Sequence, residues 1–190
     1  YLTVDTEDWF CQTQPKALAH LRNNAGRADY DVLRFVSNTK GVSNAELSLL
    51  TNRLEILGMD RVQLSDSQSV IIYPREGKIA LKEGRDFAFD GRIQAGNFTF
   101  KGEKFDFDYD EFAIKLLEVD QVSIQVDDLD ERDAYGNPVK KSVQSKLERV
   151  SGTLFVDHPN NRSGWRSEDY PQYPIFNSDE TSFVYYDDVR

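Results

Sequence analysis

Hydrophobic and polar residues alternate in short stretches from Arg53 onward, which is the spacing of β-strands with one buried face. Turn-forming residues separate these stretches at residues 83–85, 95–97, 101–103 and 108–110, and connections this short join antiparallel strands. The expected strands contain the apolar residues Leu54/Ile56, Val62/Leu64, 70–73, Ile79/Leu81, Phe87/Phe89, Phe98/Phe100, Phe105/Phe107, Phe112/Ile114 and Val122/Ile124/Val126. The pattern predicts a mainly β (α+β) fold, arranged as an antiparallel meander, a sandwich or a β-solenoid-like sheet.

The first part of the chain has helical spacing instead. The capping and apolar positions that suggest helices are Pro15, Ala17, Leu18, Leu21, Asp29, Asp31, Val32, Leu33, Phe35, Val36, Ser43 and Glu46. Towards its end a strand stays open as an alternative, because Leu47, Leu49 and Thr51 also alternate. The sequence therefore predicts a small helical N-terminal portion over residues 1–52, followed by a β-rich domain over residues 53–190.

Two long loops are expected within the β-rich domain. Residues 127–142 begin with a run of acidic side chains and contain Gly, Asn and Pro, which favours a loop. A strand is expected over residues 143–156, with a bulge at Gly152. Residues 158–180 contain three prolines and predict the second loop, and a last strand is expected over residues 181–187.

Phenylalanine is concentrated in the middle of the β-rich domain, where each expected strand has one aromatic face and one small or polar face. Together these rings would expose about 1,000–1,750 Å², far more apolar surface than a soluble monomer tolerates. We therefore expect them to point the same way and to be hidden from water, so that Phe98→Asp would unfold the domain. Either this chain covers the face, or the face is an open ligand groove for acyl chains or an adjacent module. The residues concerned are Phe87, Phe89, Phe98, Phe100, Phe105, Phe107 and Phe112.

Charge and composition narrow the range of partners. The formal net charge is −10, which disfavours nucleic acid and anionic membrane surfaces, because phosphates require a cationic counterface. No apolar run is long enough for a direct membrane span. The single cysteine, Cys11, excludes an intrachain disulfide and a cysteine-rich zinc site.

Residues 32–59 resemble half of a winged helix-turn-helix, a family that places its second helix in the major groove of DNA. The first 60 residues carry six Lys or Arg against eight Asp or Glu, and no basic recognition helix is present. We therefore expect no nucleic acid partner.

Candidate catalytic and metal-binding chemistry is sparse. His20 and His158 have no histidine close by in sequence, and we expect ordinary surface histidines. Asp128, Asp130 and Asp133 are the metal candidates, but the register of a calcium-binding EF-hand is absent, which favours a solvated loop. The sequence contains none of the common nucleotide-binding, esterase or metalloprotease motifs, and it predicts no catalytic residue and no cofactor.

Residues 105–126, FDFDYDEFAIKLLEVDQVSIQV, carry a broader resemblance that extends over about residues 53–157. This part of the chain resembles the β-rich segments of AsmA-like and related lipid-bridging proteins of the bacterial envelope. The resemblance implies short strands stacked into a half-pipe with an apolar interior.

The chain begins and ends in strand-like residues, so we expect a piece of a longer polypeptide. These observations favour a non-catalytic structural or binding module of a larger bacterial protein, located in the cell envelope or outside the cell. Its expected partners are adjacent segments of the same longer chain or another envelope protein. A lipid-contacting bridge segment with an apolar β groove and an enzyme domain with an unrecognised carboxylate site are the alternatives.

Overall fold

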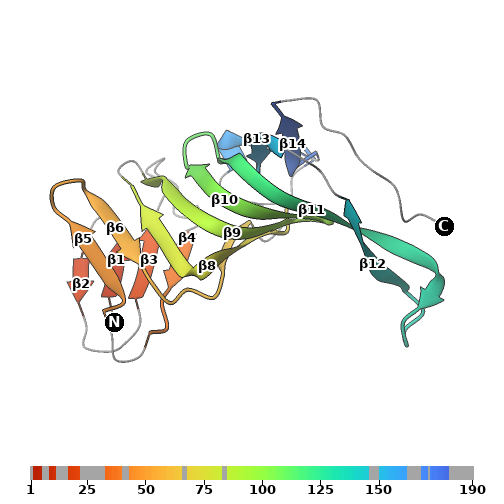
Figure 1. The fold of residues 1–190 in the computed structure, drawn as a ribbon, viewed down its shortest axis with the longest axis horizontal. Coiled ribbons are helices and arrows are strands. Elements are labelled where there is room, and N and C mark those ends of the chain that lie inside the picture. Colours follow the sequence, from red (N-terminus) through yellow and green to blue (C-terminus); the bar gives the residue numbers. More distant parts are fainter. Residues whose placement is uncertain are drawn as a thin grey trace.

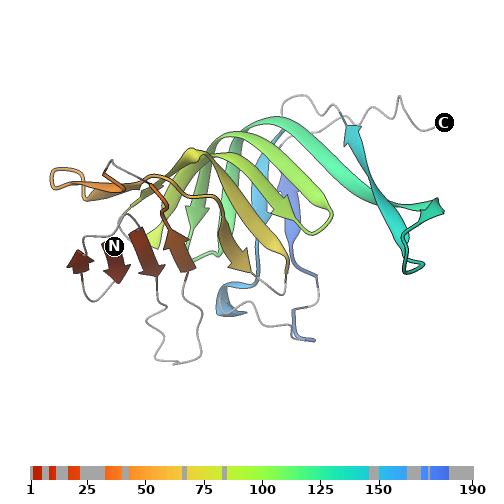
Figure 2. The ribbon, with the colours of Figure 1, turned by 90° about the horizontal axis from the view of Figure 1, so that it is seen from below.

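A computed structural model describes residues 2–5, 9–11, 17–21, 33–39, 43–65, 68–82, 85–145, 150–161, 168–170 and 172–179 of the chain. These residues form two β-sheets and a short 3₁₀ helix at Pro159–Asn161, so the predicted mainly β class is confirmed. The larger sheet is a curved layer from which one long hairpin projects (Figures 1 and 2).

The larger sheet has ten strands among the described residues, and all its pairings are antiparallel. Its order is β14-β13-β11-β10-β9-β8-β6-β5, with β12 also paired to β11 and β7 to β8. The consecutive order from β8 to β11 is the antiparallel meander expected from the alternation. The strands are β5 (Ala45–Ser48), β6 (Arg53–Ile56), β7 (Val62–Ser65), β8 (Val70–Leu81), β9 (Phe87–Ala95), β10 (Phe98–Asp108), β11 (Ala113–Arg132), β12 (Pro138–Ser145), β13 (Val150–Phe155) and β14 (Ile175–Ser178).

The smaller sheet comes from the N-terminal part of the chain and has the order β2-β1-β3-β4. Its strands are β1 (Leu2–Asp5), β2 (Trp9–Cys11), β3 (Ala17–Leu21) and β4 (Leu33–Val36). The strands β1 and β3 are parallel, whereas the other two pairs are antiparallel.

The predicted helices are therefore wrong at residues 17–21 and 33–36, which are strands, and at residues 45–48 the structure has the strand that was the alternative to a helix. Apolar runs of four or five residues fit a helix and a strand equally well, and pairing with neighbouring strands decides between them. At the expected capping box, the Ser43 hydroxyl donates to the Ala45 carbonyl at 2.9 Å. The strands also overturn the helix-turn-helix resemblance. Residues 12–16, 22–32 and 40–42 of the helical prediction lie outside the described residues.

Several strand pairs expected to be separate are joined into long strands. Phe98 and Phe107 lie on the same strand, β10, because residues 101–103 form a β-bulge and not a turn. Bulges also interrupt the β8–β9 pairing between Pro74 and Ile79, and the β11–β13 pairing between Leu116 and Val119. The turns expected at residues 95–97 and 108–110 are confirmed.

These bulges follow one another from strand to strand and form a crease across the sheet. Gly91 lies in the middle of the crease, paired with Pro74 on one side and Gly102 on the other. A β-carbon on Gly102 would lie 2.0 Å from the Glu118 carbonyl oxygen, and one on Gly91 would lie 2.3 Å from that of Tyr73. Glycine is required at both positions because the strands approach too closely for any side chain.

The loop expected over residues 127–142 is also wrong. Strand β11 continues to Arg132 and β12 begins at Pro138, so a hairpin with a five-residue turn replaces the loop. The acidic run that suggested a loop lies on this hairpin, and Asp127, Asp130 and Glu131 are exposed, which a strand on the solvent side tolerates. Within residues 158–180, the described parts include the 3₁₀ helix and β14, and the strand expected over residues 181–187 lies outside the described residues.

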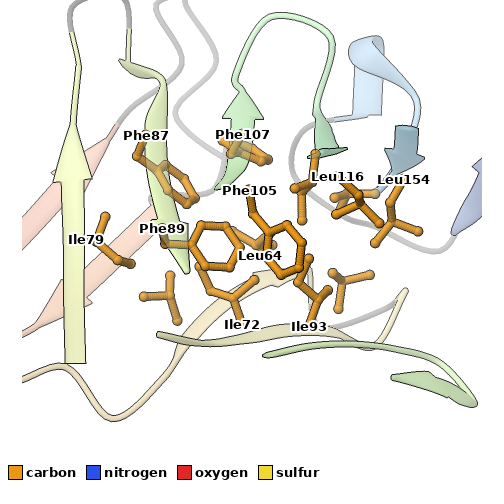
Figure 3. Packing of buried hydrophobic residues seen from close by; sticks show 14 of the residues in the cluster. Leu64, Ile72, Ile79, Phe87, Phe89, Ile93, Phe105, Phe107, Leu116 and Leu154 are labelled. Atoms are coloured by element: carbon orange, nitrogen blue, oxygen red, sulfur yellow. The ribbon is translucent and has the colours of Figure 1, made fainter. Parts of the chain in front are cut away.

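The core lies against the concave face of the larger sheet. Side chains from β7, β8, β9, β10, β11 and β13 converge there (Figure 3), among them Ile72, Phe89 and Leu154. Strand β4 of the smaller sheet contributes Leu33 and Phe35, both buried, to the same cluster.

Candidate functional site

Six of the seven phenylalanines singled out in the sequence are brought together in the core. Phe87, Phe89, Phe100, Phe105, Phe107 and Phe112 are each between 0 and 5 % exposed. Phe98 is 45 % exposed, although it shares its face of β10 with Phe100. The expectation that these rings avoid water is confirmed for the six and wrong for Phe98, which points the same way but is exposed and is consequently a poor residue for testing the core.

Parts of the same chain cover the six buried rings. Phe35 of β4 packs edge-on against Phe87 at 5.3 Å between ring centroids. On the same face but towards the opposite edge of the sheet, Phe176 of β14 contacts Phe100 at 5.0 Å between ring centroids. Phe87 and Phe107 stack on each other at 4.7 Å, so the centre of the face is filled with closely packed aromatic side chains.

The segments that cover the aromatic face of the sheet do not extend over the start of β10. Phe98 lies opposite Ile124 of β11, and the same face continues along β11 to Val126 and across to Val139 of β12. Ile124 and Val139 are half-buried, while Val126 is 43 % exposed. We call these four residues the apolar strip. It is continuous with the buried face of the sheet, because Val122 and Phe100, two residues further in on each strand and on the same face, are buried.

The strip leads onto the projecting hairpin seen in Figure 1, residues 126–141, which we call the arm. Past Gln125, whose N–H donates to the Asn97 carbonyl, β11 pairs only with β12 among the described residues. The Asp133 carboxylate fixes the turn of the arm by accepting the N–H groups of Tyr135 at 2.9 Å and Asn137 at 2.8 Å. These bonds, the one from Asn137 foremost, lower the pKa of Asp133.

The three metal candidates lie on this arm, and the carboxylates of Asp128 and Asp133 serve its structure. Asp128 forms an ion pair with Lys141, which lowers its pKa, and it also accepts the Asp130 N–H at 2.9 Å. Asp133 closes the turn. Among the described residues, no group of three or more His, Cys, Asp or Glu side chains is arranged to hold a metal ion.

A second carboxylate of interest, that of Asp157, lies two residues after the end of β13 and is fully buried. Its Oδ1 accepts the His158 N–H at 2.7 Å, and its Oδ2 accepts amide N–H groups of Asn161 at 3.1 Å and Gln68 at 3.3 Å. Burial raises the pKa of Asp157, and no cationic side chain contacts it among the described residues. With both oxygens engaged and no surface exposed, this carboxylate fastens the β7–β8 turn to the end of β13.

His158 follows directly and lies among aromatic side chains. Its ring stacks on Tyr170 at 4.4 Å and meets Tyr173 edge-on at 6.3 Å. It is half-buried, and its Nδ1 accepts the Asn160 N–H at 3.1 Å. The sequence offered no signal for this cluster, because its members are brought together by a strand end and an irregular segment.

A hollow of about 460 Å³ lies on the outer face of the sheet beside the crease. Its floor contains Ala80 and Ala88, which face each other on β8 and β9 between rows of larger polar side chains. Cations at its rim are already paired: Lys78 with Glu55 at 2.7 Å, and Arg75 with Glu103. Such exposed pairs contribute about 0–1 kcal/mol each, and they leave the hollow without a strong charge of either sign.

Comparisons with protein families, with curated proteins and with solved structures find no match for this chain. None of the described residues belongs to a helix with the length and apolar character needed to cross a membrane.

Proposed function

We propose that this chain is a non-catalytic structural or binding module of a larger bacterial protein of the envelope or exterior. Its partners in this proposal are adjacent segments of the same longer chain or another envelope protein. The observation that carries the proposal is the apolar strip, an extension of the core face beyond the point where the described residues cover it.

The arm itself supports a contact with a partner. An isolated two-stranded hairpin is at best marginally stable in water, and the arm is such a hairpin over residues 126–141. The opposite face of the arm is polar, with Asp127 and Lys140. The face with Val126 and Val139 also carries Asp128 and Lys141, which form an ion pair with each other, so a partner that covers this face would stabilise the arm while burying these two charges only as a pair.

Site-specific photocrosslinking in the full-length protein tests this proposal. A benzoylphenylalanine in place of Val126 should crosslink to a protein segment, whereas the same probe in place of Asp127, on the polar face, should not. The crosslinked product should be found in the envelope or secreted fraction. Equal crosslinking at the two positions, no crosslink at Val126, or a cytoplasmic product would contradict the proposal.

The apolar strip also favours the second candidate, a lipid-contacting bridge segment. Partly exposed Phe98 and Val126 would give an acyl chain a path from the edge of the core onto the arm. The same experiment distinguishes the two, because the probe at Val126 would then yield lipid adducts in place of peptide crosslinks.

An enzyme with a carboxylate site ranks third. Its acid or base would be Asp157 or Asp86, whose pKa values are raised, in both cases chiefly by burial. Asp157 is saturated with hydrogen bonds, and Asp86 accepts the Tyr109 N–H at 2.9 Å, which accounts for both carboxylates structurally.

A further inference from the structure

The turn between β5 and β6 exposes more apolar side chain than any other short segment described. Leu49 is 82 % exposed and Leu50 is 98 % exposed, and Leu47 on the adjoining strand is 40 % exposed. Turns of this kind ordinarily carry Gly, Asn, Asp, Ser or Pro. Because Leu49 and Leu50 bury so little of their side chains, packing within the described part of the chain does not explain them. We call Leu49 and Leu50 the leucine tip.

The leucine tip stands at an edge of the larger sheet, at the opposite end of the molecule from the arm (Figure 1). Its immediate neighbours, Ser48, Thr51 and Asn52, are uncharged hydrogen-bonding residues. The nearest charge on β6, Arg53, lies opposite Ser48 and 3.9 Å from Glu55, a carboxylate that it shares with Lys78. The apolar tip therefore extends about 3–7 Å beyond the first charged side chain, one to two residue spacings of a strand.

We propose that the leucine tip inserts into the interfacial region of an electrically neutral lipid surface. The apolar length ahead of the first charge is comparable to the depth of about 5–10 Å at which peripheral segments bury their apolar residues. A narrow convex tip displaces fluid lipid readily, whereas a protein partner would need a matching pocket. The net charge of −10 opposes binding to anionic lipids, which is why the proposed surface is zwitterionic.

The contact is an auxiliary one. Two leucines bury less apolar surface than a myristoyl chain, and one such chain alone binds membranes only marginally. In a module held near a membrane by other means, the leucine tip would set the orientation of the sheet relative to the lipid surface. This role is separate from the proposed contact of the arm, which lies on another face.

Co-sedimentation with phosphatidylcholine vesicles tests the inference. The chain should partition onto vesicles with little dependence on salt, and adding phosphatidylglycerol should weaken the binding. Leu49→Ser with Leu50→Ser should lower the partition coefficient at least about tenfold, whereas Leu50→Trp should raise it, because tryptophan favours the interface. Leu117→Ser is the matched control, since Leu117 is 57 % exposed but lies beside the crease, and it should bind as the unaltered chain does.

Both tip substitutions are at exposed turn positions, so the melting temperature should not change, and circular dichroism verifies this. Absence of binding by both the unaltered chain and Leu50→Trp at about 10 mM lipid, roughly a hundred times the dissociation constant of a myristoyl chain, overturns the inference. Equal loss of binding in Leu117→Ser overturns it as well. Self-association that disappears in the double variant, without vesicle binding, would assign the leucine tip to a protein contact instead.

Discussion

The two ends of β11 carry apolar side chains on the same face of one strand and have opposite surroundings. Over residues 113–119 the strand lies between β10 and β13, and Ile114 and Leu116 are completely buried. Over residues 126–132 it pairs with β12 alone, and Val126, on the same face, is substantially exposed. Alternation thus assigns apolar side chains to one face, while neighbouring strands determine whether that face contributes to stability or is available for contacts.

The largest expected effect on stability comes from truncating a phenylalanine in the buried part of the sheet. Phe107→Ala should lower the free energy of unfolding by about 3–5 kcal/mol, because Phe107 is fully buried and packs against Phe87 and Phe112. Phe98→Ala, at the edge of the cover, should cost only about 1–2 kcal/mol. Urea unfolding followed by circular dichroism measures both. Equal losses would mean that the apolar strip is buried in solution.

The next effect concerns the crease that shapes the covered region. Gly102→Ala should cost about 2–3 kcal/mol, because its β-carbon would collide with the Glu118 carbonyl and the crease would have to open. Gly96→Ala is the matched control: its φ of 58° is unfavourable for alanine, but nothing lies within 4 Å, so about 1 kcal/mol is expected. Thermal or urea unfolding compares them, and the reverse order would show that the bulge relaxes easily.

The smallest effect is a difference in how acid changes the stability of the arm and of the rest of the larger sheet, which we call the body. The pKa values of Asp128 and Asp133 are lowered in the folded arm, so the stability they provide is present at neutral pH and is lost below about pH 4. Asp157 and Asp86 have raised pKa values, so their protonation favours the folded body as the pH falls.

Amide hydrogen exchange, corrected for its intrinsic pH dependence, measures this difference. Between about pH 6 and about pH 3, protection should fall in the arm and persist around Phe107. Asp133→Asn retains an acceptor for the turn but does not titrate, and it should reduce the acid sensitivity of the arm. A uniform loss of protection over the whole sheet would contradict the assignment.

Two glycines with similar surroundings in sequence illustrate what local pattern leaves undecided. Gly96 and Gly102 each lie between pairs of apolar residues, and turns were expected at both. Gly96 does form a turn, whereas Gly102 forms a bulge that keeps Phe100 and Phe105 on one long strand. Glycine permits either conformation, and the choice is made by the strands alongside, which reach Gly102 and not Gly96.

The burial of the Asp157 carboxylate could not be predicted from the sequence either. Asp157 is followed by His158 and Pro159, which favours an exposed strand end, and 33 acidic residues give no reason to select one. Gln68, which lies 89 positions earlier, donates to it in the folded chain. The short N-terminal strands were mistaken for helices for a related reason, since a run such as Ala17–Leu21 is too short to establish a period.

The sequence by itself determined that the centre of the chain is β-structure and which face of each strand is apolar, because side-chain alternation is a local property of an extended backbone. Only the tertiary structure decided where that face is covered. Phe35 and Phe176, far from the central phenylalanines in sequence, close over Phe87 and Phe100, and no described residue covers Phe98 and Val126 to the same extent. Burial depends on which distant segments come together, and a pattern of neighbouring residues carries no information about those partners.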